Sequence, residues 1–404
     1  MEIYQVGGAV RDKLLGLQVA DRDWVVVGAA PEQLEQLGYR RVGRDFPVFL
    51  HPETHEEYAL ARTERKTGHG YKGFAVHAAP DVTLEDDLRR RDITINAMAM
   101  AADGTIIDPF GGQQDLQRKL LRHVSSAFTE DPLRVLRVAR FAARFAGLGF
   151  TVADDTIGLM RQIVNAGEME ALVPDRVWIE VERALGEERP SIFFEVLRGC
   201  GALARLFPEI DDLFGVPQRR DYHPEIDAGK HVMAVLDQAA RLSDSTRVRF
   251  AALMHDLGKG VTSPDVWPQH IGHEGSSVEL VKAVCARFPV PREHQDLALL
   301  AARYHTHCHR VAELRPATLL ETLYELDAFR RPDRFGQFLL VCMADARGRA
   351  GNGDAPYPQR ERMWSAFEAA RAVDAREVVA AGLAGAEVAA ELKRRRVAAI
   401  SSLP

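Results

Sequence analysis

Residues 3–12 read IYQVGGAVRD, and residues 21–28 read DRDWVVVG. The apolar runs in both segments predict strands, and the pair of glycines in the first predicts a tight turn. In a strand, residues i and i+2 point to the same face, so Asp21 and Asp23 would aim two carboxylates at one point. Such a pair suits Mg²⁺, which binds one or two carboxylates together with substrate phosphates, and backbone N–H groups at a Gly-Gly turn can approach a triphosphate closely. The two segments therefore predict phosphoryl or nucleotidyl transfer rather than hydrolysis by a protein nucleophile.

The rest of the first 125 residues alternates strand-like and helix-like segments. Strands are predicted at Ile3–Val6, Asp23–Val27, Val48–Leu50, Glu57–Leu60 and Thr105–Ile107. A helix opened by proline is predicted at Pro31–Leu37. The segment from Lys66 to Pro80 is rich in Gly, His and Ala without a clear period, which predicts a mobile loop.

After about residue 128 the pattern is helical. Apolar residues at i, i+3 and i+4 predict helices at Asp131–Phe145, Asp154–Asn165, Pro174–Leu185, Ile192–Cys200 and Lys230–Leu242. Prolines near 208–226 mark a domain boundary, and the Gly- and Pro-rich stretch Arg347–Pro358 predicts a linker before two closing helices. We therefore predict an α+β chain with a head over 1–127, a helical neck and body over 128–225, a helical domain over 226–346 and a helical tail over 347–404.

Composition limits the class of protein. The chain has 404 residues, of which 46% are hydrophobic and 27% charged, as in an ordinary globular protein. No apolar run is long enough to span a bilayer and no signal-peptide pattern is found, which predicts no membrane partner. The four scattered cysteines argue against a disulfide scaffold or a cysteine zinc site and fit a reducing cytoplasm. A net charge of −6 does not by itself indicate a nucleic-acid binder.

Two polar clusters in the head extend the transfer site. Arg62-Thr63-Glu64 follows a predicted strand, and Glu64 could bring a third carboxylate to the metal. Residues 86–97 read DDLRRRDITINA, in which Arg91 could neutralise a triphosphate. A solvated charged face is the alternative explanation of the three consecutive arginines.

A third cluster opens a predicted helix. Residues 130–140 read EDPLRVLRVAR, and Arg134, Arg137 and Arg140 recur every third residue, so their guanidinium groups line a shared side. Asp131 precedes a proline and is a good N-cap, a structural role that holds whatever else it does.

Taken in order, residues 7–12 (GGAVRD), Asp21-x-Asp23, residues 90–97 and residues 130–134 resemble the motifs of the class II tRNA nucleotidyltransferases. These CCA-adding enzymes belong to the polymerase-β superfamily. The resemblance runs from Met1 to about Ile400 and is closest to bacterial members that carry an added HD domain. It implies template-independent addition and repair of the 3′-terminal CCA of tRNA with CTP and ATP, and it leaves monomer and homodimer open.

The resemblance also implies residue roles in the transfer site. Asp21 and Asp23 would hold the catalytic Mg²⁺ ions. Gly8 and Arg11 would contact the phosphates of the incoming nucleotide, and Arg91 would contact its phosphate or sugar. Asp131 and Arg134 would imitate a template base, and Arg137 and Arg140 would lie in the same pocket. An Asp acceptor facing the amino group that C and A share, with an Arg donor beside it, would reject U and G.

A second set of motifs lies in the helical part. Residues 255–260 read HDLGKG after an apolar segment, and further histidines flank them. The set resembles the HD phosphohydrolase superfamily, which implies metal ligation by His231, His255, Asp256 and Asp345. Imidazole-rich ligation favours Ni²⁺, Mn²⁺ or Co²⁺ over Mg²⁺.

Other residues of this second set have less specific predictions. His273 and His305 could hold substrate phosphate or a second metal, Lys259 could neutralise phosphate, and His307 and His309 are predicted at the surface. The resemblance implies 2′,3′-cyclic phosphodiesterase, 2′-nucleotidase and phosphatase activities.

Two alternatives stay open at this stage. One is a poly(A) polymerase of the same class, although such enzymes usually carry a longer basic tail and lack the His-Asp set. The other is a non-catalytic RNA-binding protein built on a dead transferase. The intact Asp21, Asp23 and His255-Asp256 argue against it, because a dead site is free to lose its carboxylates.

Overall fold

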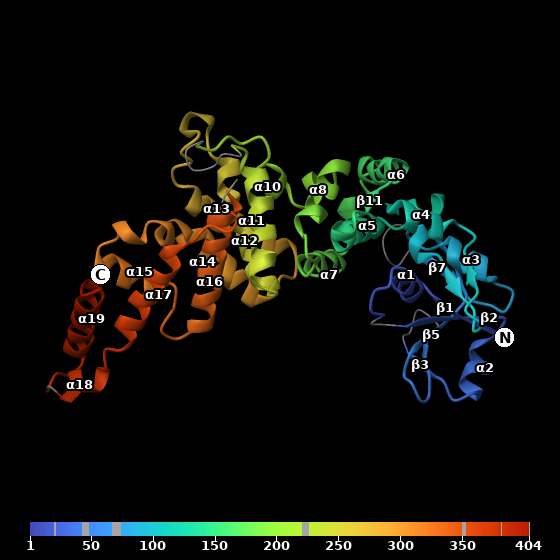
Figure 1. Cartoon of the computed structure of the whole chain (residues 1–404), viewed down its shortest axis with the longest axis horizontal. Coiled ribbons are helices and arrows are strands. Elements are labelled where there is room, and N and C mark those ends of the chain that lie inside the picture. The colour runs from blue at the N-terminus through green and yellow to red at the C-terminus, as the bar shows by residue number, and fades with distance from the viewer. Residues whose placement is uncertain are drawn as a thin grey trace. The chain divides into compact units, whose positions relative to one another are not determined.

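The computed structural model describes residues 1–19, 22–42, 48–66, 74–219, 226–349, 353–380 and 382–403 (Figure 1). The chain divides into two compact units. The first comprises Met1–Ala184 and Ile192–Leu206, and the second comprises Leu185–Ser191 and Phe207–Pro404. The fold is α+β, with a sheet-containing head at the N-terminal end and helices throughout the rest, as the sequence predicted.

The first unit is built on a seven-stranded sheet among the described residues, in the order β3-β4-β5-β2-β1-β8-β9. Its strands are β1 (Glu2–Val6), β2 (Asp23–Val27), β3 (Arg40–Val42), β4 (Val48–Leu50), β5 (Glu57–Leu60), β8 (Ala99–Met100) and β9 (Ile106–Ile107). All neighbouring pairs are antiparallel except β2 and β5, which are parallel. The five predicted strands are present, and their bounds differ by at most one residue.

Both faces of the central strand β2 are covered. Val25 packs into one apolar cluster with Val6 and Leu88, while its neighbour Val26 packs into another with Leu34 and others. Successive side chains of a strand point to opposite faces, so the DWVVV run satisfies two cores at once. The helices of this region are α1 (Gly8–Leu14), α2 (Pro31–Gln36), α3 (Leu84–Arg89), η2 (Thr94–Asn96) and α4 (Gly112–Arg118).

The prediction of a loop from Lys66 to Pro80 is wrong in part. Strand β7 (Phe74–His77) pairs antiparallel with β6 (Thr63–Lys66), with Thr63 opposite His77. A two-stranded ribbon can be held by backbone hydrogen bonds without burying one face. Its Gly-, His- and Ala-rich sequence therefore shows no alternation of apolar and polar residues. Residues 67–73 lie outside the described residues.

The rest of the first unit is almost entirely helical. Its elements are β10 (Leu120–Leu121), η3 (Ser126–Glu130), α5 (Leu133–Phe145), η4 (Ala146–Leu148), β11 (Thr151–Val152), α6 (Asp154–Asn165), η5 (Glu168–Ala171), α7 (Pro174–Leu185, whose last residue falls in the second unit), α8 (Ser191–Cys200) and α9 (Ala202–Leu206). The predicted helices agree with α6 and α7 in full and with α5 and α8 to within two residues. Most of α5 is buried, including Val135, Leu136, Val138 and Ala139.

In the described part of the second unit, the named elements are all helices. They are α10 (Pro208–Asp211), α11 (Ala228–Leu242), α12 (Thr246–Met254), η6 (Leu257–Val261), η7 (Pro264–Val266), α13 (His273–Arg287), α14 (Arg292–His309), η8 (Val311–Glu313), α15 (Pro316–Glu325), α16 (Pro332–Gly348), α17 (Pro358–Arg371), α18 (Ala375–Ala380) and α19 (Ala386–Ser401). Helices α11, α12, α14 and α16 pack side by side and form the centre of this unit (Figure 1). Among the residues described beyond the predicted linker there are three helices, α17, α18 and α19, where the sequence had predicted two.

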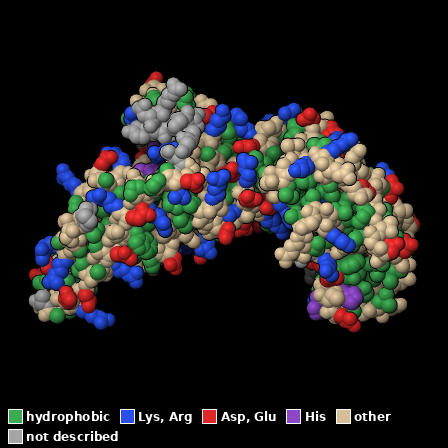
Figure 2. Space-filling model, viewed as in Figure 1, with side chains coloured by type: hydrophobic (Ala, Val, Ile, Leu, Met, Phe, Trp, Pro, Cys, Tyr) green, Lys and Arg blue, Asp and Glu red, His purple; other side chains and the backbone are tan. Residues whose placement is uncertain are grey.

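Charged side chains of both signs are interspersed on the face that Figure 2 shows. None of the helices in the described part of the chain is long and apolar enough to cross a membrane.

Candidate active sites

The end of β1 and the start of β2 bring the first motifs of the head together. The two strands are antiparallel and Val6 pairs with Asp23, so the Gly7-Gly8 turn lies beside the first residue of β2. Gly7 has φ 69° and ψ −130°, a conformation that residues with a Cβ rarely adopt, and Gly8 begins α1. Asp23 is exposed at this edge. Asp21 lies outside the described residues, so the structure places one carboxylate of the predicted pair.

Arg91 reaches the same turn from the end of α3. A Cβ on Gly7 would lie 2.8 Å from Arg91 Nη1, so a glycine leaves room for the guanidinium group. Arg91 Nη2 lies 3.2 Å from Asp87 Oδ2. Burial of Asp87 favours its neutral form, but Arg90 and Arg91 outweigh this and lower its pKa. The ion pair therefore holds a cationic group next to the glycine turn.

Arg11 connects α1 to α5. It is 3% exposed and donates hydrogen bonds to Asp12, at 2.8 Å, and to Asn96. Its guanidinium carbon lies 5.4 Å and 5.0 Å from the ring centres of Phe141 and Phe145. Burial lowers the pKa of Arg11, and the adjacent Asp12 opposes this shift. These contacts give Arg11 a structural role, and its implied contact with nucleotide phosphates stays a prediction.

The start of α5 carries the predicted base-reading residues. Asp131 Oδ1 accepts a hydrogen bond from the N–H of Leu133, the first residue of α5, at 3.0 Å, and Oδ2 lies 3.1 Å from Arg176. Arg134 donates to two backbone carbonyl groups, at 2.7 Å to Ala127 and 2.5 Å to Arg90. The structure thus places both side chains at one helix start, and their selection of CTP and ATP stays a prediction.

The remaining arginines of α5 form ion pairs with other elements. Arg137 lies 2.7 Å from Asp92, and Arg140 lies 2.6 Å from Glu180 of α7. Burial of Asp92 raises its pKa, but Arg137 and Asn96 outweigh this and leave it well below the usual range. Both arginines therefore tie α5 to its neighbours within the first unit.

Glu64, the proposed third carboxylate, is the second residue of β6.

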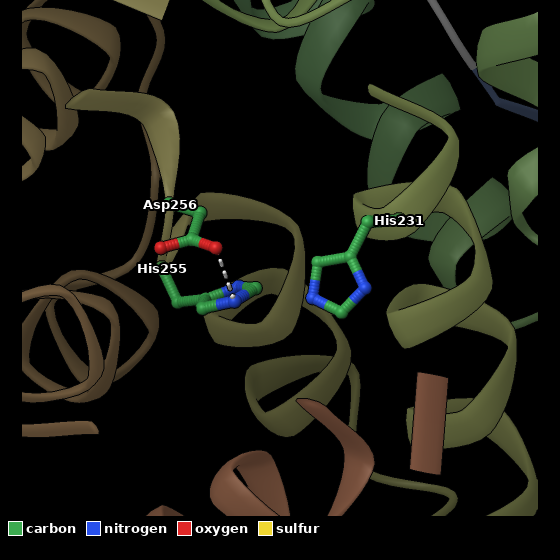
Figure 3. A group of neighbouring side chains, drawn as sticks. All are labelled: His231, His255 and Asp256. Carbon is green, nitrogen blue, oxygen red and sulfur yellow. Dashed lines mark ion pairs between the residues drawn. The ribbon is translucent and has the colours of Figure 1, made fainter. Parts of the chain in front are cut away.

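The second site lies among the central helices of the second unit. His231 comes from α11, His255 and Asp256 from the end of α12, and Asp345 from α16, and all four are buried. Figure 3 shows His231, His255 and Asp256 with their polar atoms turned toward one another. The structure therefore brings together all four ligands that the resemblance implies, although they are 114 residues apart at the extremes.

Three histidines of this site are fixed in the same tautomer. The Nδ1 atoms of His255, His273 and His305 lie 2.7 Å, 2.8 Å and 2.8 Å from the backbone carbonyl oxygens of residues 252, 270 and 301, to which each donates. When the ring is neutral, each Nε2 carries a lone pair, and the three Nε2 atoms lie 3.2–3.4 Å from the carboxylate of Asp256. A backbone acceptor on one ring nitrogen is the usual partner of a metal-binding histidine.

Several polar atoms at this centre lack hydrogen-bond partners among the residues that the structure describes. They include His255 Nε2, Asp256 Oδ1 and His273 Nε2, all buried. Buried lone pairs that converge without hydrogen-bond donors raise the free energy of the folded state unless a cation binds them. Ligand atoms of His255, His305 and Asp345, and of Asp256, His273 and His305, lie within 4.8 Å of one another. The donor set of imidazole and carboxylate groups therefore fits a divalent transition metal.

The charges of the site favour ionised carboxylates. Burial raises the pKa of Asp256, but His255 and Lys259 outweigh it and leave the pKa well below the usual range. Burial likewise opposes protonation of His255, yet the carboxylates of Asp256 and Asp345 raise its pKa to about 8. Lys259 Nζ lies 2.6 Å from Asp256 Oδ2, so the lysine lies at the centre of the site.

The site opens into a cavity of about 850 Å³. Its lining includes Asp256, Lys259, His270, His273, His305, His309, Arg310, Asp345, Arg347, Arg349 and Tyr357. The sequence prediction placed His309 at the surface, which is wrong: its Nε2 lies 2.6 Å from Asp345 Oδ2. A signal was available, since His309 lies four residues after His305 and thus on the same helix face. Tyr357 carried no signal in the sequence.

Comparisons with known proteins match the head and the helical part of the chain to described families. Residues 3–122 match the family described as "Poly A polymerase head domain", residues 149–214 match "Probable RNA and SrmB- binding site of polymerase A", and residues 229–331 match "HD domain". The Multifunctional CCA protein of Thioalkalivibrio sulfidiphilus is 63% identical over 100% of this chain and 98% of its own length. That of Nitrosococcus oceani is 63% identical over 99% and 98%.

A solved structure agrees as well. The CCA-adding enzyme of Bacillus stearothermophilus in complex with CTP is 26% identical, with a TM-score of 0.62 over 99% of this chain and 88% of that chain. The motifs of the head, the clustered HD residues and the full-length identity lead to one conclusion: the chain belongs to the multifunctional CCA proteins, with a polymerase-type head and an HD domain.

Proposed function

We propose that this chain adds and repairs the 3′-terminal CCA of tRNA using CTP and ATP, and that its HD domain hydrolyses phosphate esters at RNA ends. The observation that carries the first part is the meeting of the Gly7-Gly8 turn, Asp23 and Arg91 at one edge of the sheet. The names of the relatives, Multifunctional CCA protein, support the same reaction.

In the transfer reaction, the tRNA 3′-hydroxyl oxygen forms a bond to the α-phosphorus of CTP or ATP, and the bond to the pyrophosphate breaks. Asp21 and Asp23 would hold Mg²⁺, which when bound supplies activation of the hydroxyl and stabilisation of the pyrophosphate. Arg91 lies beside the glycine turn, where a triphosphate would meet backbone N–H groups. Gly8 and Arg11 are proposed to contact the phosphates of the same nucleotide.

Base choice is proposed for the start of α5. Asp131 would accept from the amino group that cytosine and adenine share, and Arg134 would donate to a ring acceptor. Arg137 and Arg140 would support this pocket from the next turns of the helix. A third metal ligand, if one is present, would be Glu64.

The HD domain is proposed to act as a 2′,3′-cyclic phosphodiesterase, 2′-nucleotidase and phosphatase. His231, His255, Asp256 and Asp345 would hold Ni²⁺, Mn²⁺ or Co²⁺, which when bound supplies a nucleophilic water. His273, His305 and Lys259 line the same cavity and would bind substrate phosphate. Both activities are proposed for the cytoplasm, where tRNA is processed, with the four cysteines reduced.

Four domains are proposed to divide this work. They are the transfer head at 1–127, the neck and body at 128–225, the HD domain at 226–346 and the helical tail at 347–404. A poly(A) polymerase remains the second candidate, because the family that matches the head bears that description.

The experiment is incorporation of labelled CTP and ATP into tRNA that lacks its 3′ end. We expect Asp23→Asn to lower CTP incorporation by at least 100-fold, because a ligand of the metal is lost. Asp103→Asn, an exposed aspartate in a turn of the same unit, is the matched control and should behave as wild type. Substantial addition by the Asp23 variant would rule out the transfer site, and long tails of A without CTP addition would favour the polymerase.

The HD activity needs its own measurement. His255→Ala should abolish hydrolysis of 2′,3′-cyclic AMP in the presence of Ni²⁺ or Mn²⁺ and leave CTP incorporation intact. If the variant hydrolyses at the wild-type rate, the histidine cluster is structural and the second activity is wrong.

A further inference from the structure

The HD centre is the cluster formed by His231, His255, Asp256 and Asp345. From it, three side chains in successive contact, Asp345, His309 and Tyr357, lead toward α17. Asp345 Oδ1 lies 3.0 Å from His231 Nε2, and Asp345 Oδ2 lies 2.6 Å from His309 Nε2. His309 Nδ1 in turn lies 2.7 Å from the Tyr357 hydroxyl oxygen. Asp345 is 3% exposed and Tyr357 is 7% exposed, while the side chain of His309 between them is 16% exposed and lines the cavity.

Hydrogen-bond chemistry fixes the direction of the chain. The ionised carboxylate of Asp345 only accepts, so a 2.6 Å contact with His309 Nε2 requires the proton on that nitrogen. In the neutral imidazole, Nδ1 is then an acceptor, and the Tyr357 hydroxyl donates to it. Burial raises the pKa of Tyr357, which keeps this donor protonated. The tyrosine thus selects the tautomer of His309 that donates to Asp345.

The consequence for Asp345 is a fixed orientation. With Oδ2 bound to His309, Oδ1 is turned toward His231, and Oδ2 lies 3.7 Å from His255 Nε2. A carboxylate that is free to rotate would present its oxygens to the cation only part of the time. Partners of this kind hold metal ligands in place in other metalloproteins, and their loss typically weakens metal binding about 10–100-fold.

The position of Tyr357 in the sequence makes its contact with His309 informative. His309 lies on α14 with His305, whereas Tyr357 directly precedes α17, beyond the HD helices. The HD centre is thereby linked to the start of the C-terminal helices. A tyrosine used only for packing would not need its hydroxyl within hydrogen-bond distance of a histidine.

We propose that His309 and Tyr357 are positioning residues of the HD centre, which orient Asp345 for metal binding and make the affinity of the site depend on the segment that opens α17. The proposal rests on the proposed metal site of the HD domain. It predicts effects on metal affinity that exceed any effect on folding.

The test uses the full-length protein freed of metal with EDTA and titrated calorimetrically with Mn²⁺ or Ni²⁺ at one pH. His309→Leu should weaken metal binding about 10–100-fold. His309→Gln, whose amide can still donate to Asp345, should recover part of the loss, and Tyr357→Phe should weaken binding several-fold. Matched controls are His307→Leu on the same helix and Tyr304→Phe, whose hydroxyl bonds to Glu325 outside the HD centre. Both controls should bind metal as wild type does.

Folding is followed separately by urea unfolding in EDTA. If His309→Leu does not fold, the metal affinities of His309→Gln and Tyr357→Phe are compared with that of the wild type instead. Metal affinities of the folded variants within twofold of wild type would overturn the proposal.

A wild-type chain that binds no metal, or binds it equally well after His255→Ala, would overturn the HD metal site itself and this proposal with it. Metal binding that depends on His255 but not on His309 or Tyr357 would overturn this proposal alone.

Discussion

Gly258 follows the His255-Asp256 pair at the point where α13 comes closest to it. A Cβ at this position would lie 2.1 Å from the His273 carbonyl oxygen and 2.6 Å from the Ser277 backbone nitrogen. The Gly258 N–H also donates to Ser277 Oγ at 2.8 Å. The glycine therefore lets the segment that carries two candidate ligands pack directly against the helix that begins with His273.

Gly258→Ala should destabilise the protein and loosen the HD centre. The added methyl group meets backbone rather than a flexible side chain, so α13 must move, and overpacking of this kind costs about 1–3 kcal/mol. Metal affinity should fall because His273 moves with its helix. Urea unfolding and metal titration measure the two effects.

Gly275→Ala is the matched control, because this glycine lies in α13 with no atom nearer than 3.9 Å to its Cβ position. It should stabilise the helix by about 0.5–1 kcal/mol. Equal stability of the two variants would contradict the packing role of Gly258.

Helix α14 is the element that positions much of the HD centre. It contributes His305 and His309 to the site, and its other end is fixed by His294, which is 5% exposed. His294 Nε2 lies 3.0 Å from Thr246 Oγ1 at the start of α12. Burial lowers the pKa of His294 to about 4, with Arg247 adding to this and Glu293 opposing it.

Acid should therefore weaken the α12–α14 contact through His294. The folded-state pKa lies below the ordinary value of about 6.5, so the unfolded chain binds the proton first as the pH falls. The contribution of neutral His294 to the free energy of unfolding is fully present above pH 7 and is lost between about pH 6.5 and pH 4. From pH 8 to pH 5 the loss is about 2 kcal/mol for this group.

The measurement is urea unfolding of wild type and His294→Gln at pH 8 and pH 5. Other histidines titrate in both proteins, so the difference between the two pH dependences isolates His294. The variant should lose about 2 kcal/mol less than wild type. Parallel pH dependences would show that the pKa of His294 is the same in the folded and the unfolded chain, and would contradict the prediction.

The whole molecule has two compact units with separate candidate sites. The transfer motifs Gly7, Asp23 and Arg91 belong to the first, and the HD centre belongs to the second. A cation that binds only to folded HD domain should stabilise that unit by mass action.

In calorimetry of the EDTA-treated full chain, added metal should therefore raise the unfolding temperature of the second unit alone. Mn²⁺ or Ni²⁺ at about 100 times its Kd should stabilise the second unit by about 2.7 kcal/mol and leave the first unit unchanged. Mildly destabilising substitutions of buried residues, Phe49→Leu in the first unit and Phe338→Leu in the second, identify the transitions. His255→Ala should remove the metal effect, and a metal shift that survives in it would place the binding elsewhere.

The sequence by itself determined the class of fold and the approximate bounds of five strands and six helices. Apolar periodicity located β2, α6 and α7 at their observed bounds, because local patterns of burial repeat with the strand and helix periods. It also identified His231, His255, Asp256 and Asp345, since their residue types and order resemble a family pattern. It missed β7, because strand pairing in a short ribbon leaves no local signal, and it placed His309 at the surface although the spacing of four residues from His305 indicated a shared helix face.

Only the tertiary structure decided how those residues work together. Packing of α11, α12, α14 and α16 brings side chains 114 residues apart to within hydrogen-bond distance. Backbone carbonyl groups then fix the tautomers of three histidines. The predicted arginines of α5 likewise found partners in Asp92 and Glu180 that no spacing indicates. The physical reason is that hydrogen bonds and ion pairs act over a few ångströms in space, whereas sequence patterns record only which face of an element is buried.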